Sequence, residues 1–142
     1  RQSKTIAVYE DVTGGMLANR ISQANPDKFL GAIIGGELHV IERLIDTQLV
    51  GGQTVDGDLS GRCHDLAAAI KLRTGADIGL AVHGTIDDLD QSENMARGQA
   101  HVSVTDGKNS KAMHYKSMGR SVPDKTRISL NAMSLVWEIL RN

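Results

Sequence analysis

Short apolar runs that alternate with amphipathic segments limit the folds open to this chain more than any other feature. The apolar runs are residues 4–9, 29–34 and 78–82. Each has the length of a buried strand and is bounded by turn residues. The segments between them, where apolar residues recur at helical spacing, are residues 16–21, 38–45 and 59–70. Buried strands alternating with helices predict a partly parallel sheet that is covered on both faces.

The second half of the chain adds a hairpin and a final helix. Ala100–Thr105 and Lys111–Met118 flank the turn residues 106–109, which predicts a β-hairpin. A helix is predicted over Asp124–Arg141, and the polar segment Thr85–Arg97 is interpreted as an acidic surface loop. We therefore predict a single domain, residues 1–142, with an α/β fold: a three-layer α/β/α sandwich with a mixed, mostly parallel sheet and a β-hairpin.

Helix ends and the final helix carry further signals. Asp56 or Asp58 is predicted to cap the third helix, and Gly75 to end it. The final helix has one apolar stripe for its own core and a second row beyond it, which favours a homo-oligomer, such as a dimer. The second row is Leu130, Met133, Trp137 and Leu140.

Composition excludes several classes of protein. The net charge is −1 and no Lys/Arg cluster is visible, which argues against nucleic-acid binding. No apolar run approaches the roughly 18 residues that a membrane span needs. Only 3% of the residues are aromatic, so we expect a core of aliphatic side chains. A single cysteine, Cys63, permits no internal disulfide, and its place on an apolar stripe predicts a buried structural thiol. We expect a cytoplasmic protein without a cofactor.

The first candidate site is the turn Glu10–Gly15, between the first strand and the first helix. Ligands of α/β proteins bind where strands end and helices begin, and helix N-termini attract anions. Gly14 and Gly15 would let a phosphate approach, whereas Asp11 places a carboxylate where an anion would lie. The alternative is an N-cap at a tight turn, made by Asp11 or Thr13.

Two further turns follow strands. Gly35-Gly36 either faces the same crevice or is plain turn chemistry. His83-Gly84 precedes aspartates at 87, 88 and 90, which suggests either an acid/base or cation site or merely an acidic surface loop. The spacing fits no EF-hand loop or zinc motif, and His39, His64, His101 and His114 have no metal-ligand spacing among them. We therefore predict no metal site.

The segments that carry these turns resemble the CinA C-terminal domain family, which includes bacterial nicotinamide-nucleotide amidases. Tyr9–Gly15 resembles the family signature AESCTGG, and Phe29–Ile34 is similar to the strand FLGGVVTY. Gly75–Gly84 is similar to GADYALAVTG, Gly98–Val104 to VGTVYIAL, and Lys125–Arg127 opens the last helix as a family arginine does. The resemblance implies the three-layer fold and hydrolysis of the carboxamide of nicotinamide mononucleotide by a serine nucleophile with a lysine base.

The catalytic positions of that family are changed here. Asp11 stands in the place of the serine, Gly36 in that of a nearby tyrosine, and Ile41 in that of the lysine. The resemblance retains the residues that would shape a remnant pocket together with Asp11, Gly36 and His83: Glu10, Thr13, Gly14, Gly15 and Gly84. We therefore expect a catalytically degenerate homologue that binds or regulates, with a small nucleotide-like ligand. The alternatives are a hydrolase with an altered site that uses Asp11, and a residual amidase.

Overall fold

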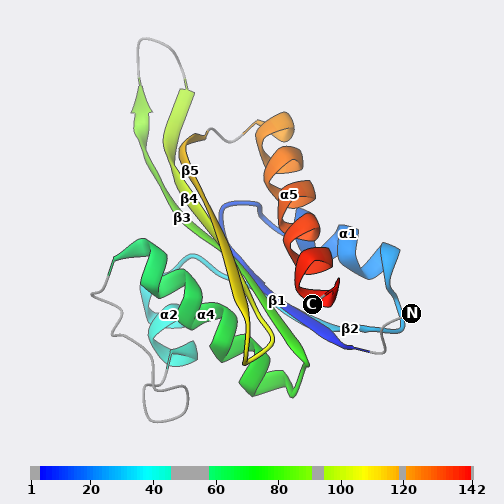
Figure 1. The fold of residues 1–142 in the computed structure, drawn as a ribbon. Coiled ribbons are helices and arrows are strands. Elements are labelled where there is room, and N and C mark those ends of the chain that lie inside the picture. The colour runs from blue at the N-terminus through cyan, green and yellow to red at the C-terminus, as the bar shows by residue number, and fades with distance from the viewer. Residues whose placement is uncertain (1–3, 46–57, 91–94, 119–120, 142) are drawn as a thin grey trace.

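The strands form one mixed five-stranded sheet in the order β2-β1-β3-β4-β5 (Figure 1). The computed structural model describes residues 4–45, 58–90, 95–118 and 121–141. The strands are β1 (Ile6–Glu10), β2 (Phe29–Ile34), β3 (Ile78–Asp90), β4 (Met95–Thr105) and β5 (Ser110–Met118). β1 pairs in parallel with β2 and β3, and β4 pairs antiparallel with β3 and β5. The predicted mixed sheet and its β4–β5 hairpin are confirmed.

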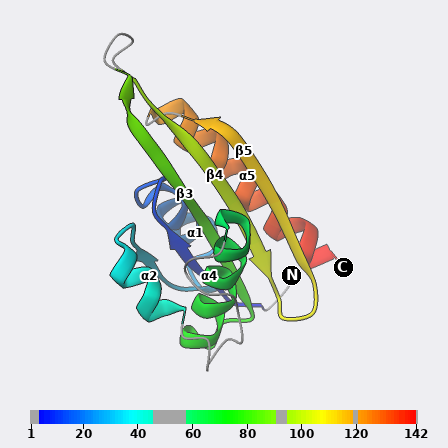
Figure 2. The same cartoon turned by 90° about the vertical axis from the view of Figure 1, so that its left-hand side faces the viewer.

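Helices cover both faces of this sheet. α1 (Met16–Ala24) and α5 (Val122–Arg141) pack on one face, and α2 (Leu38–Leu44) and α4 (Leu59–Thr74) on the other (Figures 1 and 2). The predicted three-layer α/β/α fold is therefore confirmed. Asp58 caps α4 by accepting a hydrogen bond from the Gly61 amide at 2.6 Å, and Gly75 ends the helix at φ 76°. Asp56, the alternative cap, lies outside the described residues.

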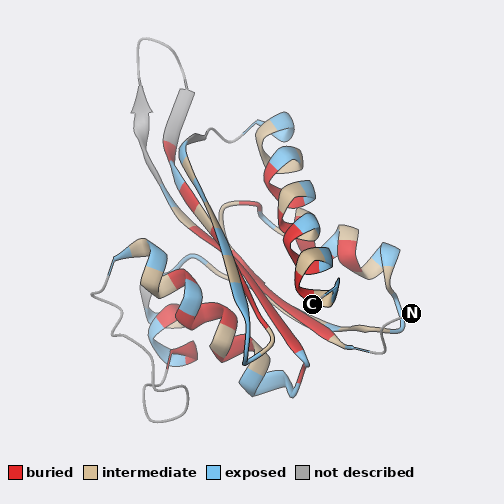
Figure 3. Ribbon diagram, viewed as in Figure 1, coloured by how far each residue is buried: buried red, intermediate tan, exposed pale blue. Residues whose placement is uncertain are grey.

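Alternation of side chains along β1 divides the core into two layers. Ile6 and Val8 of β1 face α1 and α5, whereas Ala7 and Tyr9 face α2 and α4, and all four are buried. Figure 3 shows both layers as buried stretches of the inner strands and of the helix sides facing them. Tyr9 is fully buried, so the core is not purely aliphatic.

The segment predicted as an acidic loop is a two-stranded ribbon instead. β3 continues to Asp90 and β4 begins at Met95, with Thr85 paired to Gln99 and Ile86 to Gly98. Pairing of backbone N–H and C=O groups supports strands even where the side chains offer no apolar pattern, which is why the polar sequence misled the prediction. In Figure 1 this ribbon extends beyond the helices.

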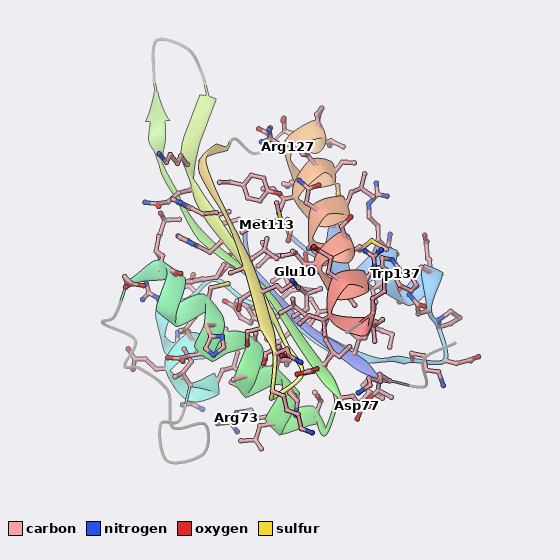
Figure 4. All side chains as sticks on the ribbon, in the orientation of Figure 1. Glu10, Arg73, Asp77, Met113, Arg127 and Trp137 are labelled. Atoms are coloured by element: carbon pink, nitrogen blue, oxygen red, sulfur yellow. The ribbon has the colours of Figure 1, made fainter. Side chains whose placement is uncertain are left out.

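α5 begins at Val122, two residues before the predicted start. Its predicted core stripe is buried: Ile128, Ala132, Leu135, Val136 and Ile139. In the second row, Leu130 and Trp137 are about half exposed, and Figure 4 shows Trp137 on the side of α5 toward α1. Association through this row stays a prediction. Among the described residues, every helix is too short or too polar to cross a membrane.

Candidate functional site

The carboxyl ends of β1 and β2 and the adjoining part of β3 enclose an open depression of about 350 Å³. It is lined by Asp11, Val12, Gly14, Gly35, Gly36, Gly84 and Lys125. β1 and β2 end at this edge and β3 passes it at Gly84. The carboxyl ends of parallel strands are the usual place of a ligand site in an α/β sheet. The turns at Asp11 and Gly36 and the β3 residue Gly84, well separated in sequence, thus meet in space.

Asp11 is held by four hydrogen bonds and its side chain is only 7% exposed. Oδ1 accepts from the backbone amides of Val12 at 2.6 Å and Gly84 at 3.1 Å. Oδ2 accepts from the Tyr9 hydroxyl at 3.0 Å and lies 2.7 Å from His83 Nδ1. The four acceptor positions of the carboxylate are therefore all taken by donors from within the chain.

The geometry also orients the two rings beside Asp11. Since a carboxylate only accepts, the proton between Asp11 and His83 lies on Nδ1. His83 is buried, and its Nε2 has no hydrogen-bond partner among the described residues. Burial, then the charge of Asp11 and the hydrogen bond to it, raise the pKa of Tyr9 well above its usual value. Tyr9 therefore stays a phenol that donates to Asp11.

Gly35 makes room for the Tyr9 ring. A Cβ at position 35 would lie 2.8 Å from Cε2 and 2.9 Å from the hydroxyl oxygen of Tyr9, closer than real Cβ contacts allow. Gly36, where the family's tyrosine would stand, has φ 146°. The phenol beside Asp11 thus comes from β1 rather than from the turn after β2.

Glu10, next to Asp11 in sequence, points to the opposite face of the sheet and caps α1. Its Oε1 accepts from the Gly15 amide at 3.0 Å, the Leu17 amide at 3.2 Å and the Thr13 hydroxyl at 2.5 Å. Its Oε2 accepts from the Ala18 amide at 2.7 Å. Figure 4 shows Glu10 on the side of the sheet that faces α5.

The sequence predicts that the turn before α1 either binds an anion or caps the helix through Asp11 or Thr13. The Glu10 cap corrects both predictions. Neither Asp11 nor Thr13 caps α1, because Asp11 turns toward His83 and Thr13 donates to Glu10. The amides that could have received an anion already bind the Glu10 carboxylate, which also meets the positive end of the helix dipole. The N-terminus of α1 is therefore not free to bind an anion.

The cation at the depression is Lys125, from the first turn of α5. Its Nζ lies 3.9 Å from the point where a Cβ on Gly14 would stand. Ile41, in the place of the family's lysine, is buried in the layer beneath α4, with 3% of its surface exposed. A residual amidase would need a lysine from elsewhere as its base, and Lys71 packs against Gly107 in the β4–β5 turn.

The other candidate groups lie apart from the depression. Cys63 is fully buried and donates to the carbonyl oxygens of Ala81 and His101, and burial raises the pKa of its thiol, as a structural cysteine requires. No three His, Cys, Asp or Glu side chains converge on a metal position within the described part of the chain. The side chains of the aspartates at 87, 88 and 90 lie outside that part.

Two histidines whose spacing in the sequence matches no metal-binding motif are nevertheless neighbours in the structure. His101 of β4 and His114 of β5 stack with their ring centroids 4.2 Å apart and their planes 4° from parallel. Burial, followed by the proximity of His114 and His83, lowers the pKa of His101. Only the strand register brings this pair together.

Sequence reasoning missed three parts of the site: the Tyr9 hydroxyl, the Glu10 cap and the lining lysine. One signal was available for two of them. Alternate residues of a strand point to opposite faces, so Tyr9 and Asp11 share one face while Glu10 takes the other. The position of Lys125 had no such signal, because it depends on how α5 crosses the sheet.

The fold is a three-layer α/β/α sandwich with a mixed sheet and an open depression where β1 and β2 end. Several solved protein structures are similar to it. A CinA-superfamily protein from Klebsiella pneumoniae 700603 aligns with a TM-score of 0.73 at 14% identity, over 98% of this chain and 88% of that one. The competence damage-inducible protein A of Klebsiella pneumoniae subsp. pneumoniae MGH 78578 gives 0.74 at 14%, over 99% and 88%. A CinA-superfamily protein from Enterobacter cloacae gives 0.69 at 16%, over 98% and 82%.

These likenesses span nearly the whole chain at low identity. No protein-family model matches the sequence, and no curated protein matches it. The chain has the fold of the CinA superfamily, as the resemblance of its segments led us to expect.

Proposed function

We propose that this chain is a catalytically degenerate relative of the nicotinamide-nucleotide amidases that binds a small nucleotide-like ligand without hydrolysing it. One observation carries the proposal: the carboxylate that stands in the serine's place is fully engaged. Its two oxygens take four hydrogen bonds from Tyr9, Val12, His83 and Gly84. A carboxylate in that state is a structural anchor that ties the end of β1 to β3.

Amide hydrolysis needs a stronger nucleophile than this. A serine hydroxyl attacks once a base takes its proton, whereas a hydrogen-bonded carboxylate is stabilised as it stands. Ile41 offers no proton acceptor and is buried. Loss of a nucleophile or its base typically costs orders of magnitude in rate, so the loss of both supports a chain without amidase activity.

Binding is supported by the shape and charge of the depression. Gly35, Gly36 and Gly84 line it with backbone rather than side chains, which leaves space for a flat ring. Lys125 supplies a positive charge for a phosphate or carboxylate group. The four donors hydrogen-bonded to Asp11 partly offset its negative charge, and Lys125 lines the same depression with the opposite charge.

The test combines binding and turnover with nicotinamide mononucleotide. We expect calorimetry to detect binding, weakened about tenfold or more in Lys125→Gln but unchanged in Lys116→Gln, which alters an exposed lysine of β5. We expect no ammonia release above blank, even at high protein concentration. Ammonia release that disappears in Asp11→Asn would contradict the loss of catalysis. An absence of binding would refute the proposal that the depression takes a nucleotide-like ligand of this kind.

A reversion experiment asks whether the ancestral pocket survives. Asp11→Ser/Ile41→Lys restores both residue types of the family's pair. Since Ile41 is buried, its replacement by lysine must be checked by thermal melting, with Ile41→Lys alone as the matched control. Ammonia release by a folded double variant, and by neither single variant, would support descent from an amidase.

One observation favours a second function, a hydrolase with altered chemistry. Asp11 orients His83 through Nδ1, and the Nε2 on the other side of the ring has no partner among the described residues. A carboxylate that holds Nδ1 and leaves Nε2 unpartnered resembles the arrangement of a general base. Because this Nε2 is buried, a substrate reaches it only when the site opens. A rate of ester hydrolysis that falls in both Asp11→Asn and His83→Asn would support this function. The same rate in the wild-type protein and both variants would exclude it.

A further inference from the structure

Three histidines occupy matching positions on adjacent strands. His83 of β3 is paired in register with His101 of β4, and His101 with His114 of β5. Exposure increases along the row, from buried His83 through half-buried His101 to exposed His114. Figure 2 shows the reason: α4 lies across β3 and β4, whereas β5 forms the edge of the sheet.

The two outer rings form a stacked pair that solvent can reach. Directly opposite residues on paired strands have Cβ atoms roughly 4.5–5.5 Å apart, so two imidazoles there lie within reach of one ion. The ring centroids are 4.2 Å apart. His114 Nε2 lies 3.1 Å from Gln99 Oε1, an atom that only accepts, so Nε2 carries a proton. In the neutral ring this leaves the lone pair of His114 on Nδ1.

We propose that His101 and His114 form a two-histidine site for a divalent transition-metal ion of the Zn²⁺, Cu²⁺ or Ni²⁺ type. Imidazole nitrogen is a preferred ligand of these ions, with Zn–N distances of about 2.0–2.1 Å. Gln99 acts as the outer partner that fixes which nitrogen of His114 binds. This site is separate from the depression beside Asp11 and does not depend on the proposed function.

Binding requires the stacked rings to open. An ion lies in the plane of each imidazole that holds it, whereas these planes are nearly parallel. Rotation about the Cβ–Cγ bonds would bring the two nitrogens toward a common point. His114 and Gln99 are both exposed, so they can turn together and keep the hydrogen bond between them. Since no third protein ligand converges on the pair within the described residues, water completes the coordination shell.

The experiment uses untagged protein and the metal salts alone. We expect calorimetry with Zn²⁺ to give one ion per chain. The affinity should fall at least tenfold in His101→Asn and in His114→Asn, and remain unchanged in His39→Asn, which removes an exposed histidine of α2. Cu²⁺ spectra should show two nitrogen ligands in the wild-type protein and fewer in His114→Asn.

Two further variants separate this site from its neighbours. Gln99→Leu should weaken Zn²⁺ binding about tenfold by releasing His114, the size of loss that outer partners of metal ligands usually cause. Asp11→Asn should leave it unchanged. His114 is exposed, so its substitution is expected to leave the fold intact. Equal Zn²⁺ affinity in the wild-type protein and His114→Asn would overturn the proposal, as would loss of binding in His39→Asn.

Discussion

Replacing Glu10 by glutamine should destabilise the protein far more than its single-atom change suggests. The Glu10 side chain is fully buried, and its carboxylate accepts four hydrogen bonds. In Glu10→Gln the amide oxygen can take the place of Oε1 and keep the donors Thr13, Gly15 and Leu17. The NH₂ group then faces the Ala18 amide, donor against donor.

The magnitude follows from what is lost. A hydrogen bond to a charged group contributes about 1.5–3 kcal/mol, and the charge at the helix N-terminus contributes about 0.3–1 kcal/mol more. The free energy of unfolding should therefore fall by roughly 2–4 kcal/mol, out of the roughly 5–15 kcal/mol typical of a domain. For a chain of this size that corresponds to a melting temperature lower by about 7–13 °C.

Urea unfolding followed by circular dichroism measures the change. We expect the midpoint to fall while the slope stays the same, because the surface exposed on unfolding does not change. The matched control is Glu42→Gln on the exposed side of α2, which should stay within about 0.5 kcal/mol of the wild-type protein. A Glu10→Gln variant as stable as that control would refute the capping argument.

Two further predictions concern buried groups beside the depression. The pKa of Tyr9 is raised on folding, so its contribution to stability is complete below pH about 10, where the unfolded chain also keeps the phenol protonated, and is lost as the pH rises above that value. Urea unfolding at pH 8 and pH 11 should thus show a smaller loss in Tyr9→Phe than in the wild-type protein, and equal losses would contradict this. The Cys63 thiol is buried with a raised pKa, so a thiol reagent should modify it only after urea unfolds the chain. Rapid labelling of the native protein would contradict the prediction that folding makes the Cys63 thiol inaccessible.

The sequence by itself determined the order and type of most elements. Apolar runs and helical spacing predicted β1, β2, the start of β3 and the four helices, because burial imposes a local period on each element. The resemblance of Tyr9–Gly15 and Gly75–Gly84 to the CinA family agreed with the same fold. Where no burial pattern exists, as in the ribbon after Gly84, the sequence pointed to a loop and was wrong.

Tertiary structure alone decided the chemistry of the site. Asp11 and His83 are 72 residues apart, and only the parallel pairing of β1 with β3 places their side chains 2.7 Å from one another. The same holds for His101 and His114, which meet through the register of β4 and β5. A hydrogen bond or a metal site depends on distances of a few ångströms between strands, and local sequence patterns carry no information about register between segments far apart in the chain.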